Sequence, residues 1–247
     1  MVVTAAHHEK LWQLAHRAAD DLEGAPPEEV LHWASDEFGE KFCLTSSMAD
    51  AALVHLASEV IPGVDVLFLD TGYHFAETLG TRDAVAAHLP VRVVTVTPEQ
   101  SVAEQDAEHG PRLFESDPDR CCLLRKVRPL NLALARYVAW GSGIRRDETA
   151  SRRHVRVVEW DYRRAMIKVN PLASWTQEQH DRYVQDHGVL RNPLMDDGYA
   201  SLGCAPCTVR TARGENARAG RWAGSGKTEC GLHGPKVLPV ASKTGTR

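Results

Sequence analysis

The chain has 247 residues, of which 43% are hydrophobic and 25% are charged, close to the average of folded, soluble proteins. This composition excludes a disordered, collagen-like or coiled-coil chain, and the length suffices for one large domain or two small ones. The first residues lack the basic and apolar stretches of an export signal, and no apolar run approaches the ~18 residues that cross a membrane. We therefore expect a cytoplasmic protein with no membrane partner.

The net charge of -4 conceals a strong asymmetry along the chain. Residues 1–110 hold 5 Lys and Arg against 19 Asp and Glu, whereas residues 111–247 hold 24 against 14. Arginine outnumbers lysine 22 to 7, and planar guanidinium groups suit phosphate or sulfate oxygens. The pattern favours a compact anionic ligand, with a solvated charged surface as the alternative. Nucleic acid is disfavoured, because aromatic residues are sparse after Trp175 and the isoelectric point is about 6.3.

Helices and strands are expected to alternate along most of the chain. The predicted helices span residues 7–22, 27–39, 50–60, 75–88, 98–109, 119–136 and 176–188. The predicted strands span residues 41–46, 64–70, 91–96, 136–143, 155–161 and 166–170. Alternation of this kind predicts an α/β fold, a doubly wound and mostly parallel sheet with helices on both faces. We expect one domain over residues 1–247: N-terminal helices (1–40), an α/β core (41–190) and a loop-rich C-terminal segment (191–247).

Three loops of this core are expected to meet at one edge of the sheet, beyond the carboxyl ends of the strands, where such folds bind ligands. The first contains Ser46 and Ser47, and its amides precede a helix, so it suits an anion. The second is Asp70-Thr71-Gly72, and the third carries Arg145 and Arg146 after a glycine turn. Helix capping, turn geometry and solvent exposure are the simpler explanations of these three loops.

The six cysteines favour metal or redox chemistry over disulfides in a chain without an export signal. Cys43 lies in a predicted strand and is expected to be inert. The other five are Cys121, Cys122, Cys204, Cys207 and Cys230. Two pairs of thiolates suit zinc or an iron-sulfur cluster, and the cluster is favoured because adjacent helical cysteines point about 100° apart and can reach separate irons.

Two further residues stand near these cysteines. Lys126 follows Cys122 by one helical turn, so its ammonium could lie between an anionic cluster and an anionic substrate. Cys230 is unpaired. The neighbouring cations would lower its pKa toward neutrality, which favours the nucleophilic thiolate.

These residues resemble the PAPS reductase family, and within it the bacterial assimilatory adenylyl-sulfate reductases that use thioredoxin. The specific features are the double cysteine at 121–122, the Cys-Ala-Pro-Cys at 204–207 and the Glu-Cys-Gly-Leu-His at 229–233, supported by residues 69–75, 143–149 and 217–222. The resemblance runs from about Phe42 to His233 and implies a fold of the adenine nucleotide alpha hydrolase-like, PP-loop type. One departure is that Ser47 stands where the family often has a glycine.

The resemblance also implies the roles of individual residues. Cys121, Cys122, Cys204 and Cys207 would bind a [4Fe-4S] cluster, and Cys230 would be the nucleophile. The residues implied for substrate binding are Ser46, Ser47, Asp70, Thr71, Gly72, Lys126, Arg145, Arg146, Arg218, Arg221 and His233.

The implied reaction is the reduction of adenosine 5'-phosphosulfate (APS) to sulfite and AMP, in sulfate assimilation toward cysteine. The Cys230 thiolate attacks the sulfate sulfur, leaving an S-sulfocysteine that thioredoxin, the electron donor, then reduces. The alternatives are a cluster-containing reductase of PAPS, the 3'-phosphorylated nucleotide, a PP-loop ATP-dependent enzyme that thiolates tRNA, and a non-enzymatic metal module. The sequence leaves a homo-oligomer open.

Overall fold

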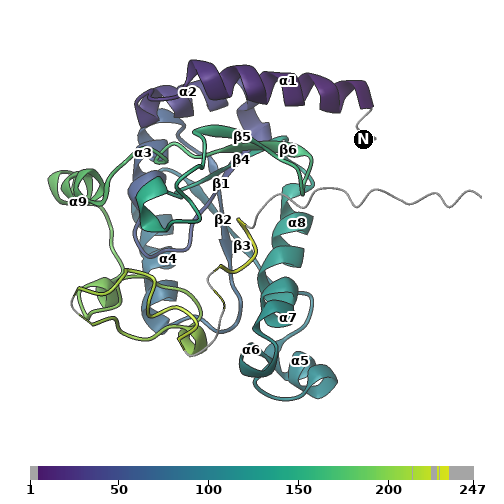
Figure 1. Ribbon diagram of the computed structural model, residues 1–247, viewed down its shortest axis with the longest axis vertical. Helices are drawn as coiled ribbons and strands as arrows, with labels where there is room; N and C mark the ends of the chain where they lie inside the picture. Colours follow the sequence, from purple (N-terminus) through teal and green to yellow (C-terminus); the bar gives the residue numbers. More distant parts are fainter. Residues whose placement is uncertain (1–4, 213, 224–226, 228, 234–247) are drawn as a thin grey trace, which may run out of the picture.

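A computed structural model describes residues 5–212, 214–223, 227 and 229–233, and the rest of the predicted C-terminal segment lies outside the described residues. Within them, six strands form one sheet in the order β3-β2-β1-β4-β6-β5 (Figure 1). The strands are β1 (Phe42–Thr45), β2 (Asp65–Leu69), β3 (Arg92–Val96), β4 (Ala139–Ser142), β5 (Val158–Asp161) and β6 (Met166–Val169). All neighbouring pairs are parallel except β5 and β6, which confirms the predicted fold class.

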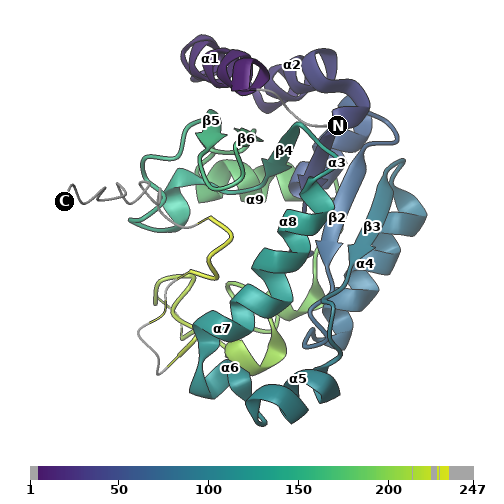
Figure 2. The same cartoon turned by 90° about the vertical axis from the view of Figure 1, so that its right-hand side faces the viewer.

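Helices cover both faces of this sheet (Figure 2). The main helices are α1 (Ala5–Asp21), α2 (Pro27–Phe38), α3 (Ala52–Val60), α4 (Ala76–His88), α5 (Val102–His109), α8 (Arg128–Leu134) and α9 (Gln177–Asp186). Successive strand residues point to opposite faces, so Phe42 and Leu44 join the larger apolar core with α1, α2 and α3, whereas Cys43 packs with α8. No described helix is long and apolar enough to cross a membrane.

The helix predicted at residues 119–136 is present, but it contains a π-helical turn that the prediction missed. The short α6 (Leu113–Ser116) precedes it, and α7 (Pro118–Cys122), the π-helical turn (Leu123–Val127) and α8 then follow one another directly. Pro129 explains the irregular turn, because proline has no N–H to donate to the carbonyl of Arg125 and its ring crowds that carbonyl. The wider turn changes the rotation of α7, which carries Cys121 and Cys122, relative to α8.

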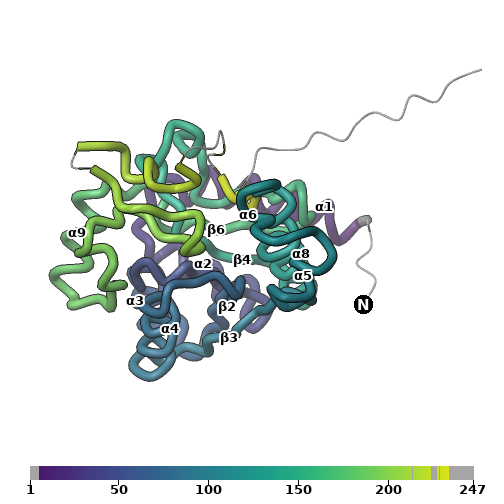
Figure 3. The backbone as a smooth tube through the Cα atoms, turned by 90° about the horizontal axis from the view of Figure 1, so that it is seen from below, coloured from purple at the N-terminus to yellow at the C-terminus, as the bar shows by residue number. Residues whose placement is uncertain are grey.

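The chain after α9 contains little regular structure but returns to the carboxyl edge of the sheet. Two 3₁₀ turns, Pro193–Met195 and Ala205–Cys207, are its described helical elements. The amide of Ala205 donates to the carbonyl of Tyr73 (2.7 Å), which ties this segment to the loop after β2. Seen from below, the segment runs from the side of α9 toward that of α8 (Figure 3).

Candidate active site

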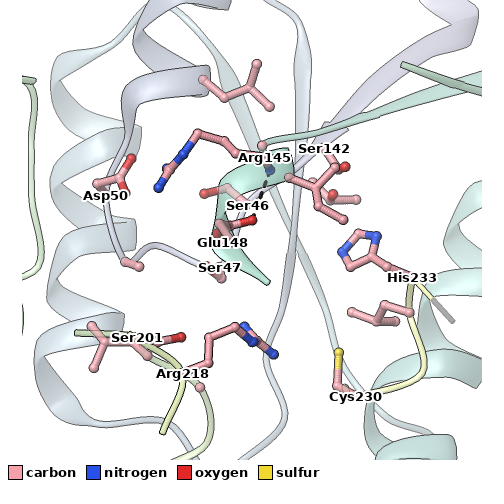
Figure 4. Close-up of a pocket in the computed structure, with 18 of the residues that line it drawn as sticks. Ser46, Ser47, Asp50, Ser142, Arg145, Glu148, Ser201, Arg218, Cys230 and His233 are labelled. Carbon is pink, nitrogen blue, oxygen red and sulfur yellow. Dashed lines mark hydrogen bonds between the residues drawn. The ribbon is translucent and has the colours of Figure 1, made fainter. Parts of the chain in front are cut away.

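A cavity of about 280 Å³ opens at the carboxyl edge of β1 and β4 (Figure 4). It brings together eight of the predicted site residues: Ser46, Ser47, Lys126, Arg145, Arg218, Arg221, Cys230 and His233. They come from the loops after β1 and β4, the π-helical turn and the C-terminal segment. Residues more than 180 positions apart in the sequence therefore share one cavity, with hydroxyl, cationic and thiol groups on its wall.

The loop after β1 is shaped by its own serine. The Ser46 hydroxyl accepts a hydrogen bond from the amide of Met48 (3.2 Å), and Met48 is fully buried in a left-handed conformation with φ of 57°. This turn brings Ser46 and Ser47 to the cavity wall, ahead of α3. The positive end of α3 lies behind them, an arrangement suited to an anion.

The two arginines after β4 have different positions. Arg145 is buried at the cavity wall, where its guanidinium donates to Gln177 (2.5 Å) and its amide donates to Glu148 (2.9 Å). Arg146 lies outside the cavity wall, since its guanidinium donates to the carbonyl of Val155 (2.7 Å) and pairs with Glu23 in the turn after α1. The geometry therefore places Arg145 for ligand binding and Arg146 against the turn that follows α1.

The Asp70-Thr71-Gly72 loop also lies outside the wall of the main cavity. The Asp70 carboxylate accepts from the amide of Gly72 (3.0 Å), whose φ of 72° favours glycine. The buried Thr71 hydroxyl lies 3.3 Å from the sulfur of Cys204. This loop is thus positioned to hold a cysteine.

Cys121, Cys122, Cys204 and Cys207 line a second, smaller cavity together. Helix α7 supplies the first two, Cys204 caps the 3₁₀ turn Ala205–Cys207, and Cys207 ends that turn. Burial raises the pKa of Cys121 to about 12 and that of Cys122 to about 11. Such thiols become thiolates when a cationic centre compensates their charge, so the four-cysteine donor set fits a metal cofactor.

The same four thiols can be compared with the requirements of a single metal ion. Within the described part of the chain, no three His, Cys, Asp or Glu side chains are placed to hold a single metal ion. The four cysteines share one cavity, a donor set that zinc or an iron-sulfur cluster can use.

Lys126 borders both cavities. Burial opposes its charge, but attraction to Cys204 and Cys230 outweighs burial and raises its pKa. The same ammonium helps to lower the pKa of Cys204, together with the Thr71 hydrogen bond, against the effect of burial. Lys126 therefore remains a cation between the cysteine cavity and the main cavity.

Cys230 lies in the wall of the main cavity, with its sulfur directed toward the open centre that Arg218 also faces (Figure 4). Three residues on, the His233 ring stacks on Trp140 with centroids 5.8 Å apart. Burial, followed by the charges of Lys168 and Arg152, holds the pKa of His233 well below its usual range. His233 is therefore neutral at pH 7.

Comparison with known proteins assigns the family. The sequence model of the phosphoadenosine phosphosulfate reductase domain matches residues 41–210. The chain belongs to this family. It is 61% identical to an adenosine 5'-phosphosulfate reductase of Streptomyces coelicolor, over 92% of this chain and 96% of the relative, and 52% identical to one of Mycolicibacterium smegmatis, over 94% and 98%.

Solved structures agree with the family assignment. A phosphoadenylyl-sulfate (PAPS) reductase from Candida auris, in a phosphate complex, is 28% identical with a TM-score of 0.67, covering 85% of this chain and 99% of that chain. An FMN adenylyltransferase from Candida glabrata, in complex with FMN and an ATP analogue, is 12% identical with a TM-score of 0.55, covering 80% and 64%. The latter likeness concerns the fold alone.

This member of the PAPS reductase family also has cavity residues that the sequence did not identify. Arg152, Glu148, Ser142 and Ser201 all line the main cavity. In the sequence, Arg152 lies among other arginines that suggest a solvent-exposed charged surface. Its ion-pair partner Glu229 is 77 residues away. Spacing alone carries no signal for such a pair.

Proposed function

We propose that this chain is an adenosine 5'-phosphosulfate reductase that releases sulfite and AMP and takes its electrons from thioredoxin. The relatives named for this activity and sharing 52–61% of the sequence support it. The observation that carries the proposal is the pair of adjoining cavities, one lined by four cysteines and the other by Cys230, the serine loop and arginines.

In the first step, the Cys230 thiolate attacks the sulfate sulfur of APS. A sulfur–sulfur bond forms, the bond from sulfur to the bridging phosphate oxygen breaks, and AMP leaves with that electron pair. The product on Cys230 is an S-sulfocysteine. Lys126, Arg218 and Arg221 line the cavity and would offset the negative charge that the thiolate and the sulfate oxygens bring together.

In the second step, a thiolate of reduced thioredoxin attacks the Cys230 sulfur. Sulfite leaves with the electron pair of the sulfur–sulfur bond, and a mixed disulfide remains. The second thioredoxin thiol resolves that disulfide, which restores the Cys230 thiol and leaves thioredoxin oxidised. The two electrons come from thioredoxin alone, so the reaction needs no further reductant.

We further propose that Cys121, Cys122, Cys204 and Cys207 hold a [4Fe-4S] cluster. Their shared cavity supports it, as do the raised pKa values of Cys121 and Cys122. When bound, the cluster supplies positive iron centres that keep the four cysteines deprotonated and fix the C-terminal segment to α7. Lys126 then lies at the boundary between the cluster and the substrate.

The proposed setting is cytoplasmic sulfate assimilation toward cysteine, with APS as substrate in preference to PAPS. The names of the bacterial relatives favour APS. The likeness to the Candida auris enzyme makes PAPS the second candidate. The proposed contacts of Asp70, Thr71, Gly72 and Arg146 with substrate receive less support from the geometry than those of the eight cavity residues.

The decisive experiment measures sulfite release from APS and from PAPS with reduced thioredoxin, on protein purified without oxygen and assayed for iron and sulfide. We expect turnover of APS, little turnover of PAPS and four irons per chain, about the content of one [4Fe-4S] cluster. Cys230→Ala should lose sulfite release and keep its iron. Cys43→Ala is the matched control, because Cys43 is fully buried in β1 outside both cavities. Turnover by Cys230→Ala, or sulfite from a colourless protein, would contradict the proposal.

A further inference from the structure

Glu229, the residue before Cys230, is bound by two arginines from different parts of the chain. The Nε and Nη2 atoms of Arg152 donate to its two carboxylate oxygens, each at 2.9 Å. Arg218 donates to the same carboxylate at 3.2 Å. The three side chains are only 10–17% exposed. A shielded two-point arginine–carboxylate pair is among the strongest and most directional polar contacts in proteins.

Arg152 is itself fixed to the loop after β4. Its Nη1 atom donates to Glu148 at 2.5 Å, and the same carboxylate oxygen of Glu148 accepts from the amide of Arg145. Burial opposes the charge of Arg152, but its contacts with Glu229 and Glu148 outweigh burial and raise its pKa. A continuous chain of contacts thus runs from Arg145 at the cavity wall to the residue beside Cys230.

The other side of Cys230 is anchored to a different element. The carbonyl of Gly231 accepts from Arg163, the carbonyl of Leu232 accepts from Arg164 (3.3 Å), and His233 stacks on Trp140. These partners belong to the β5–β6 turn and β4, so they contact the segment 231–233 independently of Arg152. Cys230 therefore lies between two anchors, and Glu229 supplies the side-chain anchor that precedes it.

We propose that Glu229 is a positioning residue: its carboxylate, held by Arg152, fixes Cys230 in the cavity before any substrate binds. The kinetic consequence rests on the proposed function, whereas the placement of the thiol does not. Glu229→Gln keeps the size of the side chain but removes its charge and one of its acceptor oxygens. Arg152 retains Glu148 as a carboxylate partner in this variant, so we expect the fold to persist.

The test measures alkylation of Cys230 by iodoacetamide without substrate, followed peptide by peptide with mass spectrometry over a range of pH. The plateau rate at high pH, where an accessible thiol is fully ionised, reports how exposed the sulfur is and stays unchanged if the thiol stays in place. We expect the plateau rate of Glu229→Gln to rise about five-fold, because the segment opens locally. An unchanged plateau overturns the proposal.

Two comparisons sharpen this test. Asp20→Asn removes another arginine–carboxylate pair, with Arg156 at 2.6 Å, at a site where Asp20 is 76% exposed, and it should match the wild type. Arg152→Gln should raise the plateau by no more than Glu229→Gln does, because Arg218 still binds the carboxylate, and the double variant should rise no further than Glu229→Gln. Additive increases overturn the proposal.

The kinetic readout separates the inference from the proposed function. Glu229→Gln should lower kcat for APS by about ten-fold, with KM changed less than about two-fold, because the nucleophile is misplaced while the binding groups remain. An unchanged kcat overturns the positioning role. If the wild-type protein fails to reduce APS, the proposed function fails, and the alkylation rates still decide whether Glu229 holds Cys230.

Discussion

The strands of the sheet are held by apolar packing, whereas the segment after α9 is held largely by polar contacts of arginine. Phe42, Leu44 and Val66 are at most 2% exposed within one apolar core. In the C-terminal segment, by contrast, Arg221 donates to the carbonyl of Leu202 (2.6 Å) and Glu229 is paired with Arg152. The residues proposed for chemistry thus lie on a part of the chain whose position depends on charges. Changes in the two regions should consequently affect different properties.

The largest effect is expected at the cysteine cavity. Cys204→Ala should abolish sulfite release and remove the iron, because one of the four proposed ligands is lost. The sheet should persist, since its apolar cores do not include Cys204. Circular dichroism should therefore stay close to the wild type while proteolysis of residues 191–233 becomes faster. A variant that loses the sheet together with its iron would contradict the separation of the two regions.

The next largest effect is expected at Lys126, which borders both cavities. Lys126→Gln should lower kcat by about 10²–10³-fold, because a cation facing developing negative charge is removed. The iron content should change little, as the four cysteines remain. Arg128→Gln is a suitable control, since Arg128 is an exposed cation two residues further along the same helical region. Equal loss of activity in both variants would show that Lys126 has no special role.

A sequence can predict the sheet region because the pattern lies in neighbouring residues. The strand over 64–70 reads as an apolar run, and the structure has β2 at Asp65–Leu69. The same approach missed the interruption of the helix around Pro129, since a π-helical turn has no regular spacing of its own. The cysteine pairs could be found by their spacing, and the structure gathers them in one cavity. The Arg152–Glu229 pair could not, because it joins residues 77 positions apart.

In the sheet, a change should alter stability before it alters chemistry. A Cβ atom on Gly141 of β4 would lie 2.5 Å from Cδ2 of Leu44 and 3.1 Å from Cζ of Phe42, so Gly141→Ala must displace core side chains. We expect a loss of about 1–3 kcal/mol in the free energy of unfolding, measured with urea. Gly80→Ala in α4 is the matched control, because nothing lies within 4 Å of its Cβ position, and it should gain up to about 1 kcal/mol. A neutral Gly141→Ala would show that the core is loosely packed.

Acid should loosen the C-terminal segment through His233. Because the pKa of His233 is held below its usual range in the folded state, the unfolded chain binds more protons below about pH 6.5, and stability falls as the pH drops through that region. At pH 5.5, this one group lowers the free energy of unfolding by at most about 1.4 kcal/mol. Hydrogen exchange of residues 229–233, relative to the sheet, should rise between pH 7.5 and 5.5. In His233→Asn the change should be smaller, and an equal change in both proteins would assign it to another group.

The smallest effect is expected where the two regions meet, at Thr71. Its hydroxyl lies 3.3 Å from the sulfur of Cys204 and helps to lower the pKa of that thiol. Thr71→Val keeps the shape and removes the hydrogen bond, at a cost of about 1 kcal/mol. Iron should then be lost to a chelator about five-fold faster, with the unfolding of the sheet nearly unchanged. Thr81→Val in α4, whose hydroxyl donates to the carbonyl of Glu77 (2.8 Å), removes a partly buried hydrogen bond of a residue that lines neither cavity, and it should leave iron loss at the wild-type rate. If both variants lose iron equally fast, retention depends on overall stability and Thr71 makes no specific contribution.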